Sequence, residues 1–226
     1  MPTVTTIAID GPVASGKTVV GRRVADALGF RFLDSGAMYR AVTLAALRGD
    51  VPLTDDDALT ACAVASDLSL GDAPEGTRVL LDGDDVTDKL RGPDVEGVVS
   101  RVAAVAGVRH VLVAKQQAVA ADGAIVMVGR DIGTVVLARA DVKAYLQASV
   151  EERAKRRHSE RLGTDKETSL EAVEAALRER DHIDSSREAS PLQPAEDAVV
   201  IDTDSLTIEQ VVERVLEMAG ERSGNA

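Results

Sequence analysis

The hydrophobic residues of this chain fall into five short runs that suit buried strands, with segments of helical spacing between them. The runs are rich in Val, Ile, Leu and Ala and span residues 6–10, 30–34, 124–128, 142–147 and 198–202. Strands that alternate with helices favour right-handed crossovers and a sheet that helices cover on both faces. The pattern therefore predicts an α/β fold with a five-stranded parallel sheet.

The stretch from residue 65 to residue 92 breaks this alternation. Turn-forming residues surround the apolar run 79–81, and the turn Asp82-Gly83-Asp84 follows it. Such a pattern predicts a small β-hairpin, with a long surface excursion as the alternative. Two helical segments, 94–104 and 108–121, come next and are expected to join near Gly107. We interpret residues 61–121 as a small α+β insert in the core.

Length and composition favour one elaborated domain. The 226 residues are 45% hydrophobic, which is enough to form a full core. The chain has no apolar run near the ~18 residues that a membrane helix needs, and no leader precedes the first strand. We therefore expect a cytoplasmic protein without a membrane partner. The single cysteine, Cys62, excludes an internal disulfide and favours a buried filler over a reactive thiol.

The charge distribution points to a small anionic ligand. A net charge of −12 argues against a nucleic-acid polymer as partner, because such binding needs a broad positive surface. Positive charge is instead concentrated in one part of the chain, at Arg153, Lys155, Arg156, Arg157, Arg161, Arg178, Arg180 and Arg187. Aromatic residues make up only 2% of the chain, so we expect bases to be held by hydrogen bonds and arginine planes.

A phosphate-binding pattern joins the first predicted strand to the helix after it. Gly11, Gly16, Lys17 and Thr18 fill the pattern G-x-x-x-x-G-K-[ST], in which backbone N–H groups cradle nucleotide phosphates. The loop predicts a site for ATP or GTP and consists of Gly11, Pro12, Val13, Ala14, Ser15, Gly16, Lys17 and Thr18. Lys17 is expected at the β- and γ-phosphates and the Thr18 hydroxyl on Mg²⁺. An ordinary glycine turn is the alternative.

The rest of the chain narrows the class of P-loop protein. A guanine-binding Asn/Thr-Lys-x-Asp sequence does not occur, which argues against a GTPase. Residues 125–128 lead into Gly129-Arg130-Asp131, whereas a motor or transporter ATPase would place an acidic pair there. Small-molecule kinases remain. A phosphate acceptor arrives already ionised, so it needs surrounding cations and no general base. The histidines, His110, His158 and His182, are accordingly interpreted as surface or structural residues.

Three further motifs carry a resemblance to a known family. They read LDSGAMYR at 33–40, GRDIGTVV at 129–136 and RDHIDSSR at 180–187. In this order they resemble the bacterial cytidylate kinases, a branch of the P-loop nucleoside monophosphate kinases, and the likeness runs from about Thr6 to Ala219. The resemblance implies phosphorylation of CMP and dCMP with ATP and Mg²⁺. It also implies one domain, comprising a core (about 1–60, 122–150, 190–226), an insert for the monophosphate (about 61–121) and a short helical lid (about 151–189).

The resemblance also assigns roles to individual residues. It places Ser35, Arg40, Arg130 and Arg187 at the acceptor phosphate, and Arg180 and Asp184 at the sugar. Lys17, Arg130 and Arg187 are then the catalytic cations. The lid residues Arg153 and Arg157 are implied to bind ATP, although a solvated charged face is the alternative for that cluster.

Cytosine recognition follows from hydrogen-bond logic as well as from the resemblance. The base offers an N4 amine donor, which Asp131 can accept, and N3 and O2 acceptors, to which Ser100 and Arg109 can donate. Asp131 could instead support Mg²⁺ through water, Asp34 is the other candidate for that metal's second shell, and Ser100 could be a plain polar residue between helices. A kinase for UMP or another metabolite and a non-enzymatic nucleotide sensor are the rival functions. No leftover apolar helix is evident, which favours a monomer.

Overall fold

The computed structural model describes residues 4–73, 76–163 and 168–224, and in these ranges it contains the predicted parallel sheet. The sheet has five strands in the order β2-β6-β1-β7-β8, and every neighbouring pair is parallel. The strands are β1 (Thr6–Asp10), β2 (Arg31–Asp34), β6 (Ile125–Gly129), β7 (Val142–Gln147) and β8 (Val199–Asp202). Each lies within one residue of a predicted run, so the α/β prediction is confirmed.

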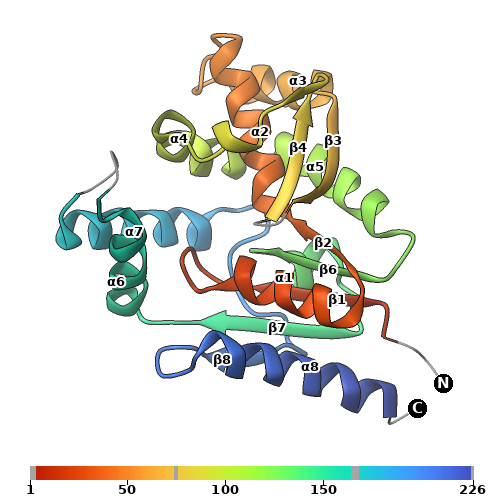
Figure 1. Cartoon of the computed structure of the whole chain (residues 1–226). Coiled ribbons are helices and arrows are strands. Elements are labelled where there is room, and N and C mark those ends of the chain that lie inside the picture. The colour runs from red at the N-terminus through yellow and green to blue at the C-terminus, as the bar shows by residue number, and fades with distance from the viewer. Residues whose placement is uncertain (1–3, 74–75, 164–167, 225–226) are drawn as a thin grey trace.

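Helices cover both faces of this sheet (Figure 1). Ile7 and Ile9 of β1 pack on one side, in a core shared with α1 (Lys17–Leu28) and α8 (Ile208–Gly224). Ala8 packs on the other side, in a core shared with α2 (Ser35–Arg48) and α5 (Ala106–Ala120). Successive strand residues point to opposite faces, so a strand buried on both faces must be apolar at nearly every position. That is why β1 reads as a continuous apolar run.

The stretch after α2 forms a smaller unit beside the sheet. It begins with α3 (Asp56–Ala65) and continues through the antiparallel strands β3 (Leu68–Ala73), β4 (Gly76–Leu81) and β5 (Asp84–Asp85). A 3₁₀ turn, η1 (Thr87–Lys89), then leads into α4 (Pro93–Ala104). Val79, Leu81 and Ala41 share a small core that fixes this hairpin against α2. The predicted hairpin is confirmed.

The junction of α4 and α5 differs from the prediction. The helices meet at Val105, which is buried and extended with φ −70° and ψ 118°, and not at Gly107. Gly107 lies inside α5, where a Cβ atom would come within 2.2 Å of the Thr60 Oγ1 atom of α3. The glycine therefore permits a close approach of α5 to α3.

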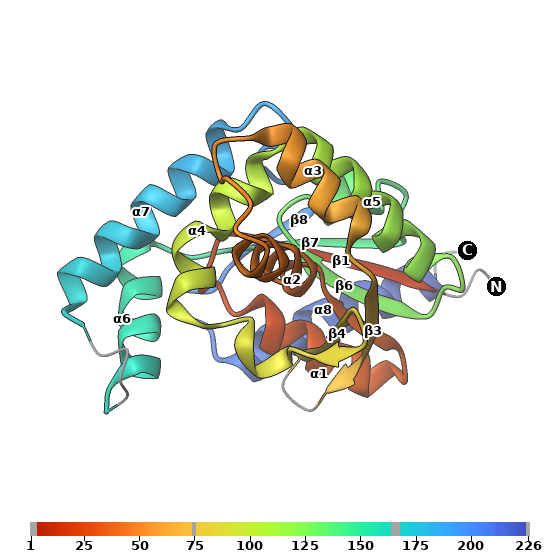
Figure 2. The ribbon, with the colours of Figure 1, turned by 90° about the horizontal axis from the view of Figure 1, so that it is seen from above.

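Two helices, α6 (Val150–Arg161) and α7 (Leu170–Ser186), stand at one end of the sheet and pack against each other (Figures 1 and 2). Serines cap both N-termini: Ser149 accepts from the Glu152 N–H and Ser169 from the Ala172 N–H. Residues 164–167 of the expected lid, and residues 1–3 and 225–226 of the expected core, lie outside the described residues.

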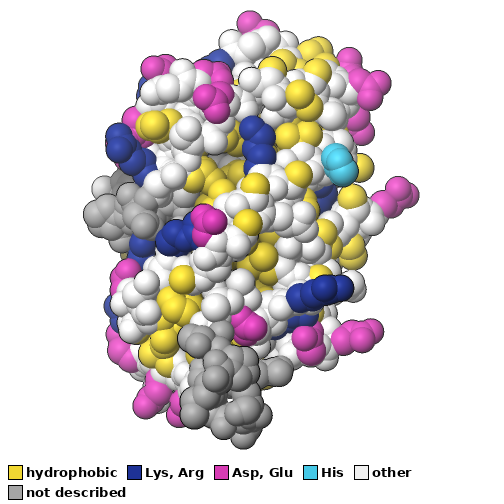
Figure 3. Space-filling model, turned by 90° about the vertical axis from the view of Figure 1, so that its right-hand side faces the viewer, with side chains coloured by type: hydrophobic (Ala, Val, Ile, Leu, Met, Phe, Trp, Pro, Cys, Tyr) yellow, Lys and Arg dark blue, Asp and Glu magenta, His cyan; other side chains and the backbone are white. Residues whose placement is uncertain are grey.

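The surface carries charged side chains of both signs. On the face beside the chain termini, basic and acidic groups are interspersed (Figure 3). His110 and His182 are exposed and His158 is partly exposed, while Cys62 packs at the edge of the core that contains α2 and α5. Among the described residues no single helix is long and apolar enough to span a membrane. The pair α4 and α5 meets that criterion only when taken together, and it is bent by 94°.

Candidate active site

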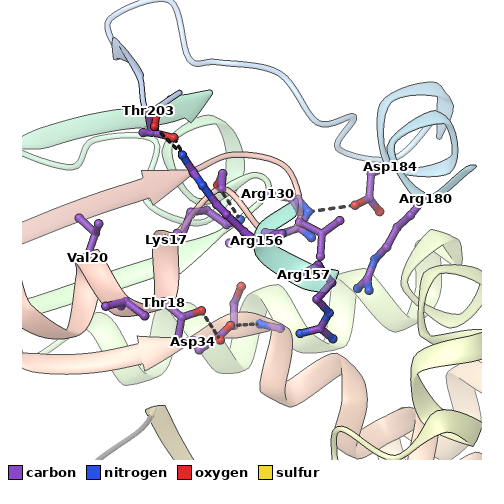
Figure 4. A pocket seen from close by; sticks show the side chains of 18 of the residues that line it. Lys17, Thr18, Val20, Asp34, Arg130, Arg156, Arg157, Arg180, Asp184 and Thr203 are labelled. Atoms are coloured by element: carbon purple, nitrogen blue, oxygen red, sulfur yellow. Dashed lines mark hydrogen bonds and ion pairs between the residues drawn. The ribbon is translucent and has the colours of Figure 1, made fainter. Parts of the chain in front are cut away.

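A pocket of about 1080 Å³ opens at the C-terminal ends of β1, β2 and β6. Its walls come from the loop after β1, from α2, α4 and α5, from the turn after β6, and from α6 and α7 (Figure 4). The loop between β8 and α8 closes the far end. Crossover loops of a parallel sheet gather at this edge, which is why ligand sites form there.

The loop after β1 curls tightly because of its backbone angles. Gly11 has φ +150°, and a Cβ atom there would lie 2.2 Å from the carbonyl oxygen of Leu146 on β7. Only glycine allows the loop to pass so close to the neighbouring strand. Ala14, at the top of the loop, also has a positive φ of 60°. The curl leaves the N-terminus of α1 facing the pocket, an arrangement suited to an anion.

Lys17 begins α1 and lies buried at the base of the loop. Its Nζ donates to the Pro12 carbonyl at 2.6 Å and to Ser15 Oγ at 3.3 Å. Burial lowers the pKa of Lys17 well below its ordinary value, and the nearby Arg130 adds to that effect, while Asp34 and Asp10 oppose it. The neighbouring carboxylates thus do not fully offset the cost of burying the charged Lys17 amine. An anion in the pocket would stabilise its charged form.

An oxygen pair lies beside the lysine. The Thr18 hydroxyl donates to Asp34 Oδ2 at 3.0 Å (Figure 4). The other carboxylate oxygen of Asp34 accepts the Gly36 N–H at 3.0 Å and caps α2. Hard oxygen ligands of this kind suit Mg²⁺, which binds protein through few groups and keeps phosphate and water ligands. No cluster of three His, Cys, Asp or Glu residues able to hold a metal exists among the described residues.

The opposite wall of the pocket is crowded with arginines around one carboxylate. Arg130 Nε donates to Asp184 Oδ2 at 2.9 Å, and an Arg187 nitrogen lies 3.8 Å from the other oxygen of Asp184. Burial alone would raise the pKa of Asp184, but Arg130 and Arg180 hold that pKa below its ordinary value. Asp184 is therefore ionised and fixes the Arg130 guanidinium in place.

This arginine cluster carries more positive charge than Asp184 can balance. Within the described chain, the buried Arg40 Nε, Arg180 Nε and Arg187 Nη2 atoms have no hydrogen-bond partner. Burial, with Arg130 and Arg40 nearby, lowers the pKa of Arg180 to about 10. Buried donors without partners cost roughly 1–3 kcal/mol each. An anionic ligand held by these groups would remove that cost.

A buried ion pair lies deeper in the pocket. Arg109 of α5 donates through Nη2 to Asp131 Oδ2, with side chains only 4% and 5% exposed. Its Nη1 donates to the Ala103 carbonyl at 3.1 Å, and its guanidinium lies 5.3 Å from the centre of the Tyr39 ring. Burial raises the pKa of Tyr39 to about 12, so the phenol stays neutral. Ser100 lines the same end of the pocket.

Most of the sequence-predicted site residues meet in this one pocket. Those that line it are Val13, Ala14, Ser15, Gly16, Lys17, Thr18, Asp34, Ser35, Arg40, Ser100, Arg109, Arg130, Asp131, Arg157, Arg180, Asp184 and Arg187. Ser35 lines the wall while its hydroxyl donates to the Val128 carbonyl at 2.9 Å. Gly11 and Pro12, the first two residues of the loop, do not line the pocket.

Arg153 also lies outside the pocket, contrary to the expectation of a direct contact with ATP. It is 3% exposed and donates to the Val13 carbonyl at 3.2 Å and to Asp181 Oδ2 at 2.6 Å. The buried Ala154 follows it and marks the inner side of α6. Arg153 thus braces the phosphate loop from behind. Arg156, which the sequence placed in the basic cluster without a binding role, lines the pocket and donates to the Thr203 carbonyl at 2.6 Å.

Comparison with known proteins identifies the family. A family model described as cytidylate kinase matches residues 7–221. The chain belongs to the cytidylate kinase family. It is 49% identical to a cytidylate kinase of Geobacillus kaustophilus over 96% of this chain and 97% of that one. It is also 49% identical to a cytidylate kinase of Rhodococcus opacus, over 96% of each chain.

Structure comparison supports the fold of this cytidylate kinase family member. An uncharacterized protein from Eubacterium ventriosum superposes with a TM-score of 0.52 at 11% identity, covering 97% of this chain and 99% of that one. At such low identity the likeness concerns the fold alone. The family assignment rests on the sequence matches, and they confirm the resemblance to the cytidylate kinases.

Two carboxylates at strand ends of this cytidylate kinase family member, Asp10 of β1 and Asp202 of β8, do not line the pocket. Asp10 is buried behind it and accepts the Ile132 N–H at 2.9 Å and the Gly133 N–H at 2.7 Å. It thereby holds the π-helical turn η2 (Ile132–Val136), which directly follows Arg130 and Asp131. Burial raises the pKa of Asp10 to about 6. Asp202 is exposed at the end of β8, next to the lining residue Thr203.

Proposed function

We propose that this protein transfers the γ-phosphoryl group of ATP to CMP and dCMP, which yields ADP and CDP or dCDP. The observation that carries the proposal is the pairing of two anion sites in one pocket. A phosphate loop forms one end, and buried arginines with unpartnered nitrogens form the other. Two nucleotides that are both anions need such an arrangement, because bringing them together is the main barrier to the reaction.

ATP occupies the loop end in this proposal. The loop residues that line the pocket, Val13 to Thr18, surround its phosphates, and Gly11 and Pro12 give the loop its shape. Lys17 exchanges the Pro12 carbonyl for the β- and γ-phosphates. Mg²⁺ would be held by the Thr18 hydroxyl, with Asp34 acting through water, and would supply charge neutralisation between the phosphates. The oxygen pair formed by Thr18 and Asp34 supports this assignment.

The acceptor phosphate lies among Arg40, Arg130 and Arg187, with Ser35 beside it. This phosphate is ionised near pH 7, so its oxygen can attack without a general base. Arg130 and Arg187, together with Lys17, then stabilise the charge that spreads over the transferring group. The planar guanidinium fork suits this task because it donates two parallel hydrogen bonds to phosphate oxygens.

The sugar and base complete the acceptor site. Arg180 and Asp184 face the sugar in this proposal. Asp131 accepts from the cytosine N4 amine, while Arg109 and Ser100 donate to N3 and O2. The buried pair of Arg109 and Asp131 supports base recognition over the alternative role of Asp131 at Mg²⁺, because Thr18 already has Asp34 as its acidic partner. Uracil carries an acceptor where cytosine carries the amine, so UMP is expected to be a poorer substrate.

The remaining assignments concern the lid, the organisation of the domain, and the protein's location and partners. Arg157 keeps its proposed contact with ATP, whereas Arg153 acts on ATP only through the loop it braces. We propose the division into core, monophosphate insert and lid given above. We expect a cytoplasmic monomer whose partners are ATP and CMP or dCMP, without a nucleic-acid or membrane partner. The net charge of −12 supports the absence of a nucleic-acid polymer.

An ADP-release assay tests the proposal. Purified protein with Mg-ATP is presented in turn with CMP, dCMP, UMP, AMP, dTMP and shikimate. We expect the highest kcat/KM with CMP and dCMP, and ADP release that depends on the acceptor. Preference for another acceptor would refute the specificity, and no acceptor-dependent turnover would favour the nucleotide sensor.

A further inference from the structure

A carboxylate on α4 joins the acceptor side of the pocket to the lid. Glu96 accepts one hydrogen bond from Arg157 Nη2 and a second, at 3.1 Å, from Arg161 Nη2. Both arginines belong to α6, which lies far from Glu96 in the sequence. The Glu96 side chain is only 13% exposed. Burial would raise the pKa of Glu96, but Arg157, Arg40 and Arg161 hold that pKa below its ordinary value.

The position of Glu96 on its helix connects it to the proposed base site. Glu96 and Ser100 are four residues apart on α4, so they lie on one helical face, and both line the pocket. Arg157 also lines the pocket and reaches Glu96 from α6. Figure 2 shows α4 beside α6 and α7, and α4 contacts α7 as well. A movement of α4 onto a base would therefore carry Glu96 with it.

We infer that Glu96 is a positioning residue that couples the two nucleotides: it links acceptor binding at α4 to the placement of Arg157 over ATP. This inference rests on the proposed roles of Ser100 and Arg157. When CMP draws α4 inward, the carboxylate holds the Arg157 guanidinium at the pocket wall. ATP then meets an arginine that is already ordered, so less conformational entropy is lost when it binds.

A purely electrostatic role predicts a different outcome. Glu96 is a negative charge beside a cationic pocket, so its removal would tighten the binding of each anionic nucleotide separately. Such an effect changes the affinity for CMP equally in the absence and in the presence of the second nucleotide. A link between α4 and α6 instead determines how much the second nucleotide changes the affinity for CMP. The coupling factor, defined as the Kd of CMP alone divided by its Kd in the presence of the second nucleotide, separates the two roles.

Calorimetry on the full chain gives this factor directly. CMP is titrated with and without a saturating ATP analogue that carries a methylene bridge between the β and γ phosphorus atoms. We expect a wild-type coupling factor of about 10 or more, within the usual 5- to 150-fold range. In Glu96→Gln we expect it to fall below about 3. CDP formation by the same wild-type preparation shows separately whether the proposed function holds.

Matched variants identify the cause of any change. Glu160→Gln removes the other carboxylate partner of Arg157, at 3.0 Å, but Glu160 belongs to α6 itself and bridges nothing. We expect Glu160→Gln to keep the wild-type coupling factor and Glu96→Asp to keep most of it. The inference is overturned if Glu96→Gln leaves the factor unchanged, if Glu160→Gln lowers it equally, if Glu96→Asp loses as much as Glu96→Gln, or if the wild type shows no coupling.

Discussion

The two proposed anion sites at the ends of the pocket are built by different means. The phosphate-loop end is one contiguous segment, where the backbone curl and the N-terminus of α1 do most of the work and Lys17 is the single buried amine. The arginine end is assembled from Arg40 on α2, Arg130 after β6, and Arg180 and Arg187 on and just after α7. The first site depends on local backbone geometry, and the second depends on the whole fold.

This difference predicts different responses to substitution. Because the loop end concentrates its side-chain charge in one residue, losing that residue should remove most of its effect. The arginine end shares its charge among several side chains around Asp184, so a single change should be buffered by the others. Substitutions at each end test whether the contrast is real.

Lys17→Ala should have the largest effect. We expect kcat with CMP and ATP to fall by about 10³, since the transferring phosphoryl group loses its amine and no neighbouring cation from the loop replaces it. The measurement is ADP release at saturating substrates, with thermal unfolding as the control for folding. A loss of less than tenfold would mean that the loop end does not depend on Lys17.

A substitution at Asp10 tests the connection between the two ends of the pocket. Asp10 ends β1 just before the phosphate loop, and it supports the turn that follows Arg130. The pKa of Asp10 rises from 3.8 to about 6 on folding, so the folded state binds the proton more tightly. Stability is therefore greatest below pH 4 for this group and falls as the pH rises through 6, by about 3 kcal/mol.

The comparison with Asp10→Asn isolates this contribution, because asparagine does not titrate. Urea unfolding of both proteins between pH 4 and pH 7 should show the stability of the wild type relative to the variant falling by about 2.5 kcal/mol. A difference that stays constant across this range would contradict the raised pKa of Asp10.

Arg130→Lys should weaken the acceptor end by about 10² in kcat/KM for CMP. The lysine keeps the charge, but it loses the fork that bonds Asp184 and is proposed to grip the phosphate. The KM for ATP should stay within about threefold, since the loop end is intact. Steady-state kinetics with each substrate varied in turn provides the test, and an equal rise in the KM for ATP would show that the ends are not separable.

Asp131→Asn should have the smallest effect, confined to base recognition. We expect kcat/KM for CMP to fall about tenfold while that for UMP holds or rises, because an amide can donate to the uracil O4 atom. The ratio of the two values in a single preparation is independent of any loss of folded protein. Equal losses for CMP and UMP would favour the role of Asp131 at Mg²⁺.

The contrast between the two ends of the pocket also explains which features could be predicted from the sequence. The phosphate loop and the strands are local signals, carried by glycine spacing and by apolar runs such as 125–128, so they were predicted closely. The arginines proposed for the acceptor site were assigned through motifs of a known family. Spacing alone does not show that Arg130, Arg180 and Arg187 converge, because they come from separate segments.

The features that the sequence did not predict correctly depend on packing between segments that lie far apart in the chain. Arg153 was expected at ATP, yet its position on the inner side of α6 turns it toward the Val13 carbonyl. Glu96 was not singled out, because its partners Arg157 and Arg161 come from a helix far along the chain. The bend lies at Val105, and the glycine expected to form it serves the close contact of α5 with Thr60 instead.

Both ends of the pocket are proposed to act on one phosphoryl group. ATP labelled with ³²P in the γ-phosphoryl group is mixed with CMP and the protein, and the nucleotides are separated. We expect the label to appear as the β-phosphoryl group of CDP, and Lys17→Ala and Arg130→Lys both to slow its appearance. Label that accumulates only as inorganic phosphate, or at a rate independent of CMP, would contradict it.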